Sequence, residues 1–314
     1  MCRRMSMKMK NETPLVSIQC LAYNHEKYIR QCLDAIVMQK TTFPFEAVVH
    51  DDASTDNTAH IIREYADRYP NIIRPIFEHE NLFSKDKKKM RQILYEHMHG
   101  AFIAFCECDD YWTDPDKLQK QIEFLQSHSD YSMCFHSARK QYETENQSWL
   151  NCEYIEDRDY TATEVFVNWI VPTASIVCRR EAWQFRFNLI GGDRILNGDI
   201  ALILSCMMTG KVRGMSEQMS VYRIQGGGVT YDKNAKRKRA MKAPHHFECL
   251  RDNFPIVDRK PLDDTIAKTY FERAIMQDTF IEKMRDFGRS LKNCPGRFFS
   301  MAIHSIWLSV KWTK

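Results

Sequence analysis

The chain has 314 residues, of which 44% are hydrophobic and 12% aromatic, enough for a sizeable core in one large domain or in one domain with an appendage. A formal net charge of only +4 gives no electrostatic basis for nucleic-acid binding, so no nucleic-acid partner is expected. The eleven cysteines are dispersed and contain no CxxC pair, which argues against a structural zinc site. They indicate reduced, buried thiols in a cytoplasmic protein.

The two ends of the chain differ from its middle. Residues 1–13 are basic and Met-rich and lack an apolar run of signal-peptide length, so we expect a disordered tail. No run of about 18 apolar residues predicts a membrane-spanning helix. Residues 298–312, FFSMAIHSIWLSVKW, are aromatic and apolar. They predict either a helix packed on its own domain or a segment lying in a membrane interface, on the inner face of the cell membrane.

Short apolar runs alternate with amphipathic patterns over the first 120 residues. The apolar, β-branched runs predict strands at residues 15–23, 45–52, 72–77 and 101–110. Patterns with one apolar face predict helices at residues 27–39 and 57–69, and a third that runs to about residue 99. This alternation is typical of a parallel sheet with right-handed crossovers and helices on both faces.

The rest of the chain is less regular. A strand is expected at residues 173–179, a turn at Gly191–Gly192 and a helix from Asp199. Beyond residue 230 the patterns are mostly helical. We therefore predict an α/β domain over residues 14–230 and a helical C-terminal extension over residues 231–314.

Polar residues follow three of the predicted strands, where ligands bind in parallel sheets. Ser54 and Asp56, after the second strand, are well suited to cap the next helix. Capping does not explain Glu107, Asp109 and Asp110, three acids within four residues that repel one another. A divalent cation relieves that repulsion, and Mg²⁺ or Mn²⁺ completes its shell with phosphate oxygens and water. The pattern favours a metal site for a diphosphate substrate over solvated loop acids.

Five segments in order carry a resemblance to a known family. They are VSIQCLAYNHEKYIRQCLDAI, DDASTDNT, ECDDYW with DPDKLQKQIEFL, NGDIALILSCMMTGKV and MSVYRIQGGGV, and together they span roughly residues 14–230. The chain resembles the family 2 glycosyltransferases, whose Rossmann-like nucleotide-sugar fold is usually called GT-A. The resemblance implies a mostly parallel sheet flanked by helices and a nucleotide-sugar donor.

Site residues follow from the resemblance position by position. Tyr23 would line the nucleotide pocket, and Asp52 would accept a hydrogen bond from the imino N–H of a uracil or thymine ring. Asp109 matches the second acid of the family's DxD motif, which coordinates the metal on the diphosphate. Glu107 stands where the family has the first Asp and would reach a ribose hydroxyl or a metal-bound water. Asp110 either supports the metal shell or caps the next helix.

Asp199 matches the family's catalytic base, which deprotonates the acceptor hydroxyl. The alternative for this residue is a helix N-cap, and Asp193 is a nearby competitor. Arg223 is similar to the arginine of the family's YR-x-H-x-G element near the phosphates. Gln225 replaces the frequent histidine, which puts a metal ligand from this loop in doubt. The resemblance also implies that Gly226–Gly228 close over the donor.

The sequence thus predicts a hexosyl- or N-acetylhexosaminyl-transferase. It would move a sugar from a UDP- or dTDP-sugar to a hydroxyl of a glycan or lipid-linked acceptor in surface polysaccharide synthesis. One metal-dependent displacement would invert the anomeric configuration. The alternatives are a non-catalytic sugar-nucleotide or partner-binding domain and a nucleotidyltransferase. A nucleotidyltransferase would have a glycine- and basic-rich phosphate loop after the first strand, where this chain has Tyr23, Asn24 and His25.

Overall fold

The computed structural model describes residues 13–143, 150–225 and 233–302. The predicted N-terminal tail lies almost entirely outside these residues. The chain divides into two compact units. The first comprises the described residues up to 161 together with 168–185 and 205–225, and the second comprises 162–167, 186–204 and the described residues after 226. The predicted C-terminal extension belongs to the second unit, which also takes up two earlier segments.

The first unit is built on an eight-stranded sheet with the strand order β3-β2-β1-β4-β7-β6-β8-β5. Its strands are β1 (Val16–Ala22), β2 (Phe45–Asp51), β3 (Ile73–Phe77), β4 (Phe102–Phe105), β5 (Tyr111–Trp112), β6 (Tyr131–Tyr142), β7 (Val177–Arg179) and β8 (Lys211–Ile224). Its helices are α1 (Ile29–Val37), α2 (Thr58–Arg68), α3 (Leu82–Lys85), α4 (Lys87–His97), α5 (Lys117–Ser127) and α7 (Arg180–Phe185).

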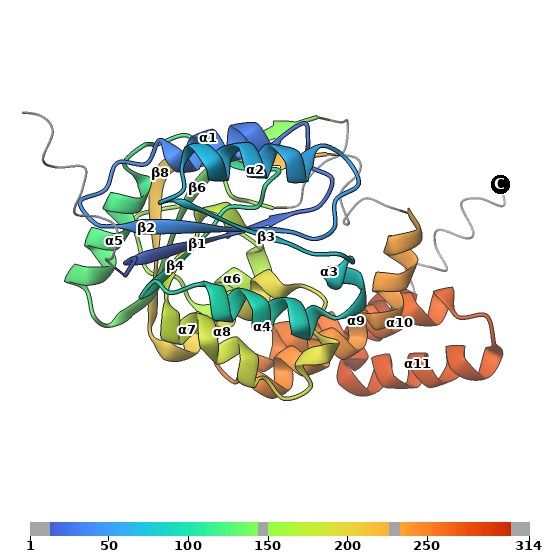
Figure 1. The fold of residues 1–314 in the computed structure, drawn as a ribbon. Helices are drawn as coiled ribbons and strands as arrows, with labels where there is room; N and C mark the ends of the chain where they lie inside the picture. Colours follow the sequence, from blue (N-terminus) through green and yellow to red (C-terminus); the bar gives the residue numbers. More distant parts are fainter. Residues whose placement is uncertain (1–12, 144–149, 226–232, 303–314) are drawn as a thin grey trace, which may run out of the picture. The chain divides into compact units, whose positions relative to one another are not determined.

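The first half of this sheet is parallel. β1 pairs in parallel with β2 on one side and with β4 on the other, and β3 pairs in parallel with β2. Helices α1 and α2 cover one face of the sheet, and α4 and α7 cover the other (Figure 1). Because both faces are covered, β1 is almost wholly buried, and only Ser17 and Gln19 interrupt its apolar residues. The predicted parallel sheet with helices on both faces is confirmed here.

The fourth strand is shorter than predicted. The regular ladder of β4 ends at Phe105, where the sequence predicted a strand to residue 110. The chain continues beside β1, since the backbone N–H of Cys106 donates to Gln19 (3.1 Å) and that of Cys108 to Leu21 (3.2 Å). A turn then begins, in which the N–H of Asp110 donates to the carbonyl oxygen of Glu107 at 2.9 Å. The acidic residues therefore lie in a turn, which frees their side chains from the alternation of a strand.

The second half of the sheet is mixed. β7 runs antiparallel to both β4 and β6, β8 is parallel to β6, and the two-residue β5 is antiparallel to β8. The strand expected at residues 173–179 is a 3-10 turn (Thr173–Ser175) followed by β7. Beside it the indole N–H of Trp112 donates to the carbonyl oxygen of Ala174 at 2.8 Å, which fixes the residues just after the acidic turn.

The second unit is helical. It contains α6 (Ala162–Asn168), the 3-10 turns at Arg186–Asn188 and Gly192–Arg194, the start of α8 (Gly198–Thr209), α9 (Lys233–Asn253), α10 (Arg259–Met276) and α11 (Phe280–Asn293). Gly191, where a turn was predicted, has φ = 67°. Residues 295–302 are also helical. Within the described ranges, no helix is both long enough and apolar enough to cross a bilayer.

The cysteines are dispersed through both units. Of the ten in the part of the chain that the structure describes, nine are buried, and all ten are free thiols. Burial raises the pKa of Cys106 and Cys20 well above the ordinary thiol value. These side chains therefore act as small apolar groups in the core.

Candidate functional site

The carboxyl ends of β1, β2 and β4 meet at one edge of the sheet. The chain runs outward from β1 to β2 on one side and returns to β4 on the other, so a topological switch lies between β1 and β4. The N–H of Asp52 donates to Ala22 at 2.9 Å, and that of Cys108 donates to Leu21. Tyr23, directly after β1, keeps 45% of its surface exposed at this edge. The predicted convergence of the three strand ends is therefore present.

The turns after β1 and β2 hold each other through side-chain hydrogen bonds. The backbone N–H of Asn24 donates to Ser54 Oγ at 2.9 Å, and Asn24 Oδ1 accepts from the N–H of Thr55 at 2.8 Å. The N–H of Glu26 donates to Asp56 Oδ2 at 3.1 Å. Asn24 and Ala53 have backbone φ values of 56° and 62°, which residues other than glycine rarely adopt. This edge of the site is a tightly specified framework.

The two residues predicted as helix caps behave differently. Asp56 Oδ1 accepts a hydrogen bond from the N–H of Thr58, the first residue of α2, at 2.9 Å. Ser54 uses its hydroxyl on the neighbouring turn, as described above, and not on α2. The local pattern suggested both caps, but it carried no information about the partner turn 30 residues earlier.

Asp52 is buried and directs its carboxylate at another helix. Oδ1 accepts from the N–H of Leu82 at 2.6 Å, and Oδ2 accepts from the N–H of Phe83 at 2.9 Å. These are the first two residues of α3, whose free N–H groups need acceptors. Each carboxylate oxygen has a second lone pair. Base recognition by Asp52 stays a prediction, in which one carboxylate serves both α3 and the nucleotide.

Asp110 is the most deeply buried of the three acids after β4. It is 1% exposed, and its Oδ1 accepts from the backbone N–H of Arg223 at 2.8 Å. Its Oδ2 has no hydrogen-bond partner in the described part of the chain. Burial, followed by the charges of Asp109 and Glu107, raises the pKa of Asp110 well above its ordinary value. Asp110 does not cap the next helix, because Asp116 occupies the N-cap position of α5.

Asp109 is only partly buried and faces Gln225. Its Oδ2 accepts a hydrogen bond from Gln225 Nε2 at 2.7 Å. An amide nitrogen is a donor and not a metal ligand, so Gln225 orients the carboxylate. Sequence reasoning noted Gln225 only as a departure from the family pattern and missed this contact.

Arg223, on β8, contacts the backbone of the acidic turn. Its guanidinium lies over the rings of Tyr28 and Tyr111, at 4.9 and 4.7 Å from the ring centroids. It donates to the carbonyl oxygen of Asp109 at 2.7 Å and to the side chain of Gln31. The predicted contact of Arg223 with donor phosphates stays a prediction. Gln31 was missed because its segment of α1 signals only an amphipathic helix.

The acid cluster suits a cation that takes few protein ligands. Among the described residues, no three His, Cys, Asp or Glu side chains are placed to hold a metal by themselves. Mg²⁺ and Mn²⁺ bound to nucleotides commonly take one or two carboxylates and complete their shells with phosphate oxygens and water. The partly exposed carboxylate of Asp109, with Glu107 beside it and an unpartnered oxygen on Asp110, fits such a donor set.

Asp199 belongs to the second unit, in the first turn of α8. The helix begins at Gly198, one residue before the predicted start, and its dipole favours a carboxylate at this end. Asp199 keeps some contact with solvent, yet burial of its carboxyl raises the pKa above the ordinary value. Arg239 opposes that rise, and its guanidinium donates to Asn197 Oδ1 at 2.7 Å. Asp193 is exposed in a 3-10 turn.

Comparison with known proteins identifies the family. Residues 17–184, more than half of the chain, match Glycosyl transferase family 2. The chain belongs to this family. An uncharacterised protein of Mycobacterium tuberculosis is 34% identical over 231 residues, which cover 74% of this chain and 65% of that protein. The chain thus spans just under two thirds of the length of this relative.

A further relative and a solved structure are similar to most of the chain. WfaP of Escherichia coli, named a UDP-Glc:alpha-D-GlcNAc-diphosphoundecaprenol beta-1,3-glucosyltransferase, is 26% identical over 258 residues, covering 75% of this chain and 91% of WfaP. The structure of TarS residues 1–349 from S. aureus, solved with UDP-GlcNAc, superposes with a TM-score of 0.62 at 16% identity, covering 90% and 82% of the two chains. The predicted family and its glycosyltransferase fold are confirmed.

Proposed function

We propose that this protein is a glycosyltransferase that moves a sugar from a nucleotide-diphosphate donor to a hydroxyl of a glycan or lipid-linked acceptor in surface polysaccharide synthesis. The observation that carries the proposal is the acidic turn after β4, at the switch point of a family 2 fold, where buried Asp110 keeps one oxygen without a hydrogen-bond partner among the described residues. The name of WfaP, with its UDP-glucose donor and diphosphoundecaprenol acceptor, supports a UDP-sugar and a lipid-linked acceptor. A dTDP-sugar remains the second donor class to test.

The donor would lie along the edge formed by the three strand ends. Tyr23 offers an exposed ring to the nucleotide, and Asp52 offers its carboxylate to the base. Asp109 would hold a divalent cation, with Asp110 as a further ligand and Glu107 reaching the ribose or a metal-bound water. When bound, that cation would neutralise the charge that develops on the departing diphosphate.

Proton transfer is assigned to Asp199. A carboxylate oxygen of Asp199 takes the proton of the acceptor hydroxyl as the acceptor oxygen bonds to the anomeric carbon. The bond to the diphosphate oxygen breaks on the opposite side, which inverts the configuration. The raised pKa of Asp199 makes it a stronger base than an ordinary carboxylate.

Replacing Asp199 tests the assignment. Asp199→Asn removes the base at nearly constant shape, and the transfer rate should fall by about 10²–10⁴-fold. Asp193→Asn, at an exposed acid a few residues earlier, is the matched control and should leave the rate unchanged. Donor consumption is measured by mass spectrometry against a panel of UDP- and dTDP-sugars with acceptor present. Near wild-type transfer by Asp199→Asn would remove this residue from the mechanism.

The pH profile gives a second test of Asp199. The base works only when deprotonated, so activity should fall as pH decreases through its pKa. Because burial raises that pKa, the acidic limb should lie above the ordinary carboxyl value of about 3.9. A limb at the ordinary value would contradict the assigned environment.

The rival functions have distinct outcomes in the same assay. A non-catalytic binding domain would bind the donor without consuming it when acceptor is supplied. A nucleotidyltransferase would release pyrophosphate, whereas a glycosyltransferase releases the nucleoside diphosphate.

The proposal also includes contact with the inner face of the cell membrane. Of the segment predicted for that contact, residues 298–312, only residues 298–302 are among the described residues.

A further inference from the structure

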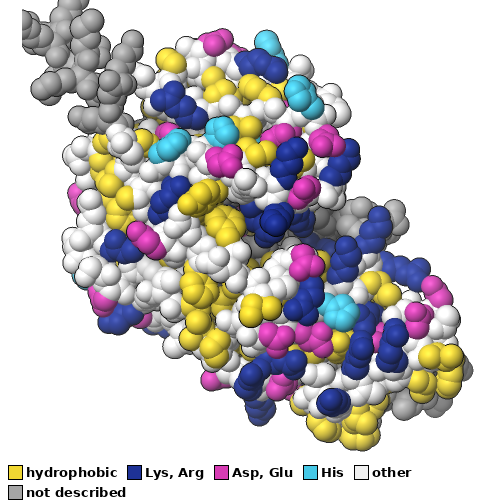
Figure 2. Space-filling model, turned by 60° about the horizontal axis from the view of Figure 1, so that its bottom comes forward, with side chains coloured by type: hydrophobic (Ala, Val, Ile, Leu, Met, Phe, Trp, Pro, Cys, Tyr) yellow, Lys and Arg dark blue, Asp and Glu magenta, His cyan; other side chains and the backbone are white. Residues whose placement is uncertain are grey.

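Helix α11 in the second unit exposes large apolar side chains. Phe280, Ile281 and Met284 are 73%, 79% and 46% exposed, and Leu291 is 37% exposed. At 100° per residue these four side chains fall within one arc of the helix, so they form a continuous apolar stripe. Figure 2, which brings this side of the helical unit forward, shows patches of hydrophobic side chains among Lys and Arg side chains.

The opposite face of α11 buries polar side chains. Asp286 and Ser290 are both fully buried. Arg273 on α10 donates from Nε and from a terminal nitrogen to the two oxygens of Asp286, at 2.8 and 2.7 Å. Ser290 Oγ donates to the carbonyl oxygen of Ala267 at 2.7 Å. These bonds fix the rotation of α11, because turning the apolar stripe inward would expose a buried ion pair and leave Arg273 uncompensated.

This arrangement departs from the usual amphipathic pattern. A surface helix ordinarily turns its apolar face to the core and its polar face to water. In α11 the buried face carries Asp286 and Ser290, Phe287 packs beside it on Phe271 of α10 at 5.2 Å between ring centroids, and the apolar stripe is left outside. The stripe is therefore exposed among the described residues and available to a partner.

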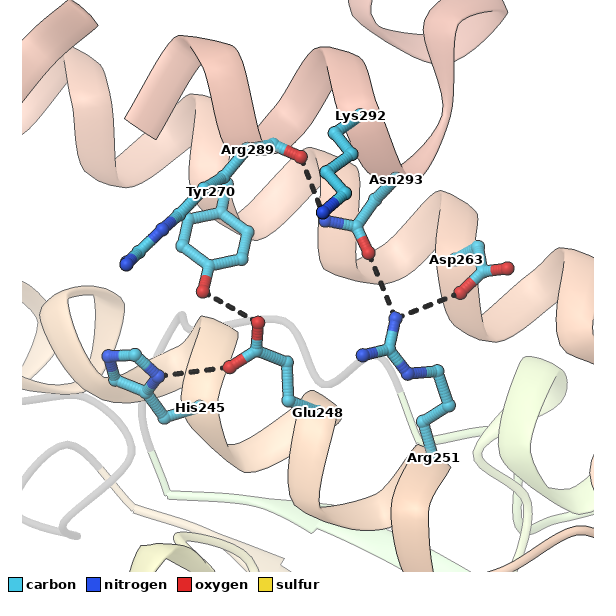
Figure 3. Close-up of a pocket in the computed structure, with 8 residues that line it drawn as sticks. All are labelled: His245, Glu248, Arg251, Asp263, Tyr270, Arg289, Lys292 and Asn293. Carbon is cyan, nitrogen blue, oxygen red and sulfur yellow. Dashed lines mark hydrogen bonds and ion pairs between the residues drawn. The ribbon is translucent and has the colours of Figure 1, made fainter. Parts of the chain in front are cut away.

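Cations border the apolar stripe on one side. Arg285, Arg289 and Lys292 follow it around the helix, and all three are exposed. Arg289 and Lys292 also line a cavity of about 470 Å³ between α9, α10 and α11, shown in Figure 3. An apolar stripe beside a basic one is typical of a helix that lies in the interface of an anionic membrane.

The carboxylates of this cavity already have partners. Glu248 accepts from the Tyr270 hydroxyl at 2.7 Å and pairs with His245 at 3.0 Å, and Asp263 pairs with Arg251 at 3.3 Å (Figure 3). In the described ranges, neither Arg289 nor Lys292 forms an ion pair with a carboxylate, although Arg289 lies 5.5 Å from the ring of Tyr270. Their charges are therefore available to an anionic ligand from outside.

We propose that α11 docks on an anionic lipid surface. Its apolar stripe enters the interface, and Arg285, Arg289 and Lys292 meet the lipid phosphates. A second copy of this chain fits less well, because an antiparallel two-fold contact along the stripe would bring two identical basic stripes together. This inference deepens the proposed function, because it assigns the membrane contact to a defined surface. It rests on the proposed function in one respect: a lipid-linked acceptor gives the enzyme a reason to be at the membrane.

Vesicle sedimentation with the full chain tests the docking surface. Wild type should bind phosphatidylcholine vesicles containing phosphatidylglycerol and bind pure phosphatidylcholine weakly. The variant F280Q/I281Q/M284Q should bind the anionic vesicles at least about tenfold more weakly. The affinity of R289Q/K292Q for the anionic vesicles should fall about fivefold for each cation removed, and added salt should reduce the difference from wild type. The control Y154Q/I190Q removes two exposed apolar side chains elsewhere and should bind like wild type.

Several results would overturn the proposal. They are unchanged vesicle binding by F280Q/I281Q/M284Q with its helical circular dichroism intact, equal binding of wild type to neutral and anionic vesicles, and no vesicle binding by wild type. If the same variant changed only the oligomeric state seen by light scattering, the stripe would serve a protein contact instead. Transfer to a soluble acceptor should be unaffected by the α11 variants, so failure of the docking surface is distinguishable from failure of the proposed reaction.

Discussion

The acidic segments after β2 and after β4 contain similar residues but differ in what their carboxylates meet. After β2, Asp52 receives two backbone N–H groups. Asp56 is likewise satisfied: although burial acts in the opposite direction, hydrogen bonds from Thr58 and Glu26 lower its pKa. After β4, Asp110 keeps one buried oxygen without a partner among the described residues, and its pKa is raised.

The difference lies in the supply of hydrogen-bond donors and not in residue type. Backbone N–H groups from two turns and from the start of α3 compensate Asp52 and Asp56, so these two acids hold the framework together. Asp51, the last residue of β2, differs from them: one of its oxygens is buried without a hydrogen-bond partner in the described part of the chain, and burial raises its pKa. In the second segment Asp110 accepts one backbone N–H and Asp109 accepts one amide N–H, while three carboxyl groups share one turn. Acids left in this condition are candidates for function, because a cation would stabilise them.

The largest expected effect is on catalysis. Asp109→Asn should lower the transfer rate by about 10²-fold or more, because the charge that would hold the cation is lost. Its free energy of unfolding should change little, since Gln225 can still bond to the new amide oxygen. Asp56→Asn is the matched control from the other segment and should show the opposite pattern, with transfer kept and stability reduced. Steady-state rates and urea unfolding measure both. Equal loss of activity in both variants would contradict the comparison.

A smaller effect is expected on stability at Asp52. Asp52→Asn leaves one acceptor oxygen for two backbone N–H groups and places an NH₂ group against one of them. The free energy of unfolding should fall by about 1–3 kcal/mol in urea titrations. A variant as stable as wild type would mean that the cap on α3 contributes nothing, and Asp52 would then be free for the nucleotide alone.

The smallest effect is expected at Asp110 in mild acid. Its pKa is raised in the folded state, so the stability it contributes is full below the unfolded pKa of about 3.9 and is lost as pH rises through the folded value. Asp110→Asn does not titrate. As pH rises from 4 to 5, the free energy of unfolding of the variant should therefore increase relative to that of wild type, by at most about 1.4 kcal/mol. Unfolding experiments with chelator present measure this difference. If Asp110→Asn instead became more stable relative to wild type as the pH was lowered, the pKa of Asp110 would be lowered and not raised by folding.

The parallel half of the sheet was predictable because its strands are buried on both faces. β1 and β2 are short and mostly buried, with apolar and β-branched residues at most positions, and the amphipathic patterns of α1 and α2 end close to where they were expected. β6 and β8 were not predicted, since their long runs mix polar and apolar residues and their pairing contains register irregularities. β5 has only two residues, too few for any periodic signal.

The residues of the site were predictable as types but not in their contacts. The acids after β4 stood out through their density, and the family resemblance proposed their roles. The bond between Gln225 and Asp109 and that between Arg223 and Gln31 join residues far apart in the sequence, where no local pattern records a partner. Likewise, no helical pattern could show that residues 186–204 join the C-terminal helices in one unit.

Manganese binding tests the central claim, that the acids after β4 hold a divalent cation against the nucleotide diphosphate. Mn²⁺ is titrated into the full chain in the presence of UDP, and the free ion is followed by electron paramagnetic resonance. Wild type and Asp56→Asn should both remove more Mn²⁺ from solution than UDP alone does, and Asp109→Asn should not. Equal Mn²⁺ binding by Asp109→Asn and wild type, or full transfer activity of wild type in excess chelator, would contradict the claim.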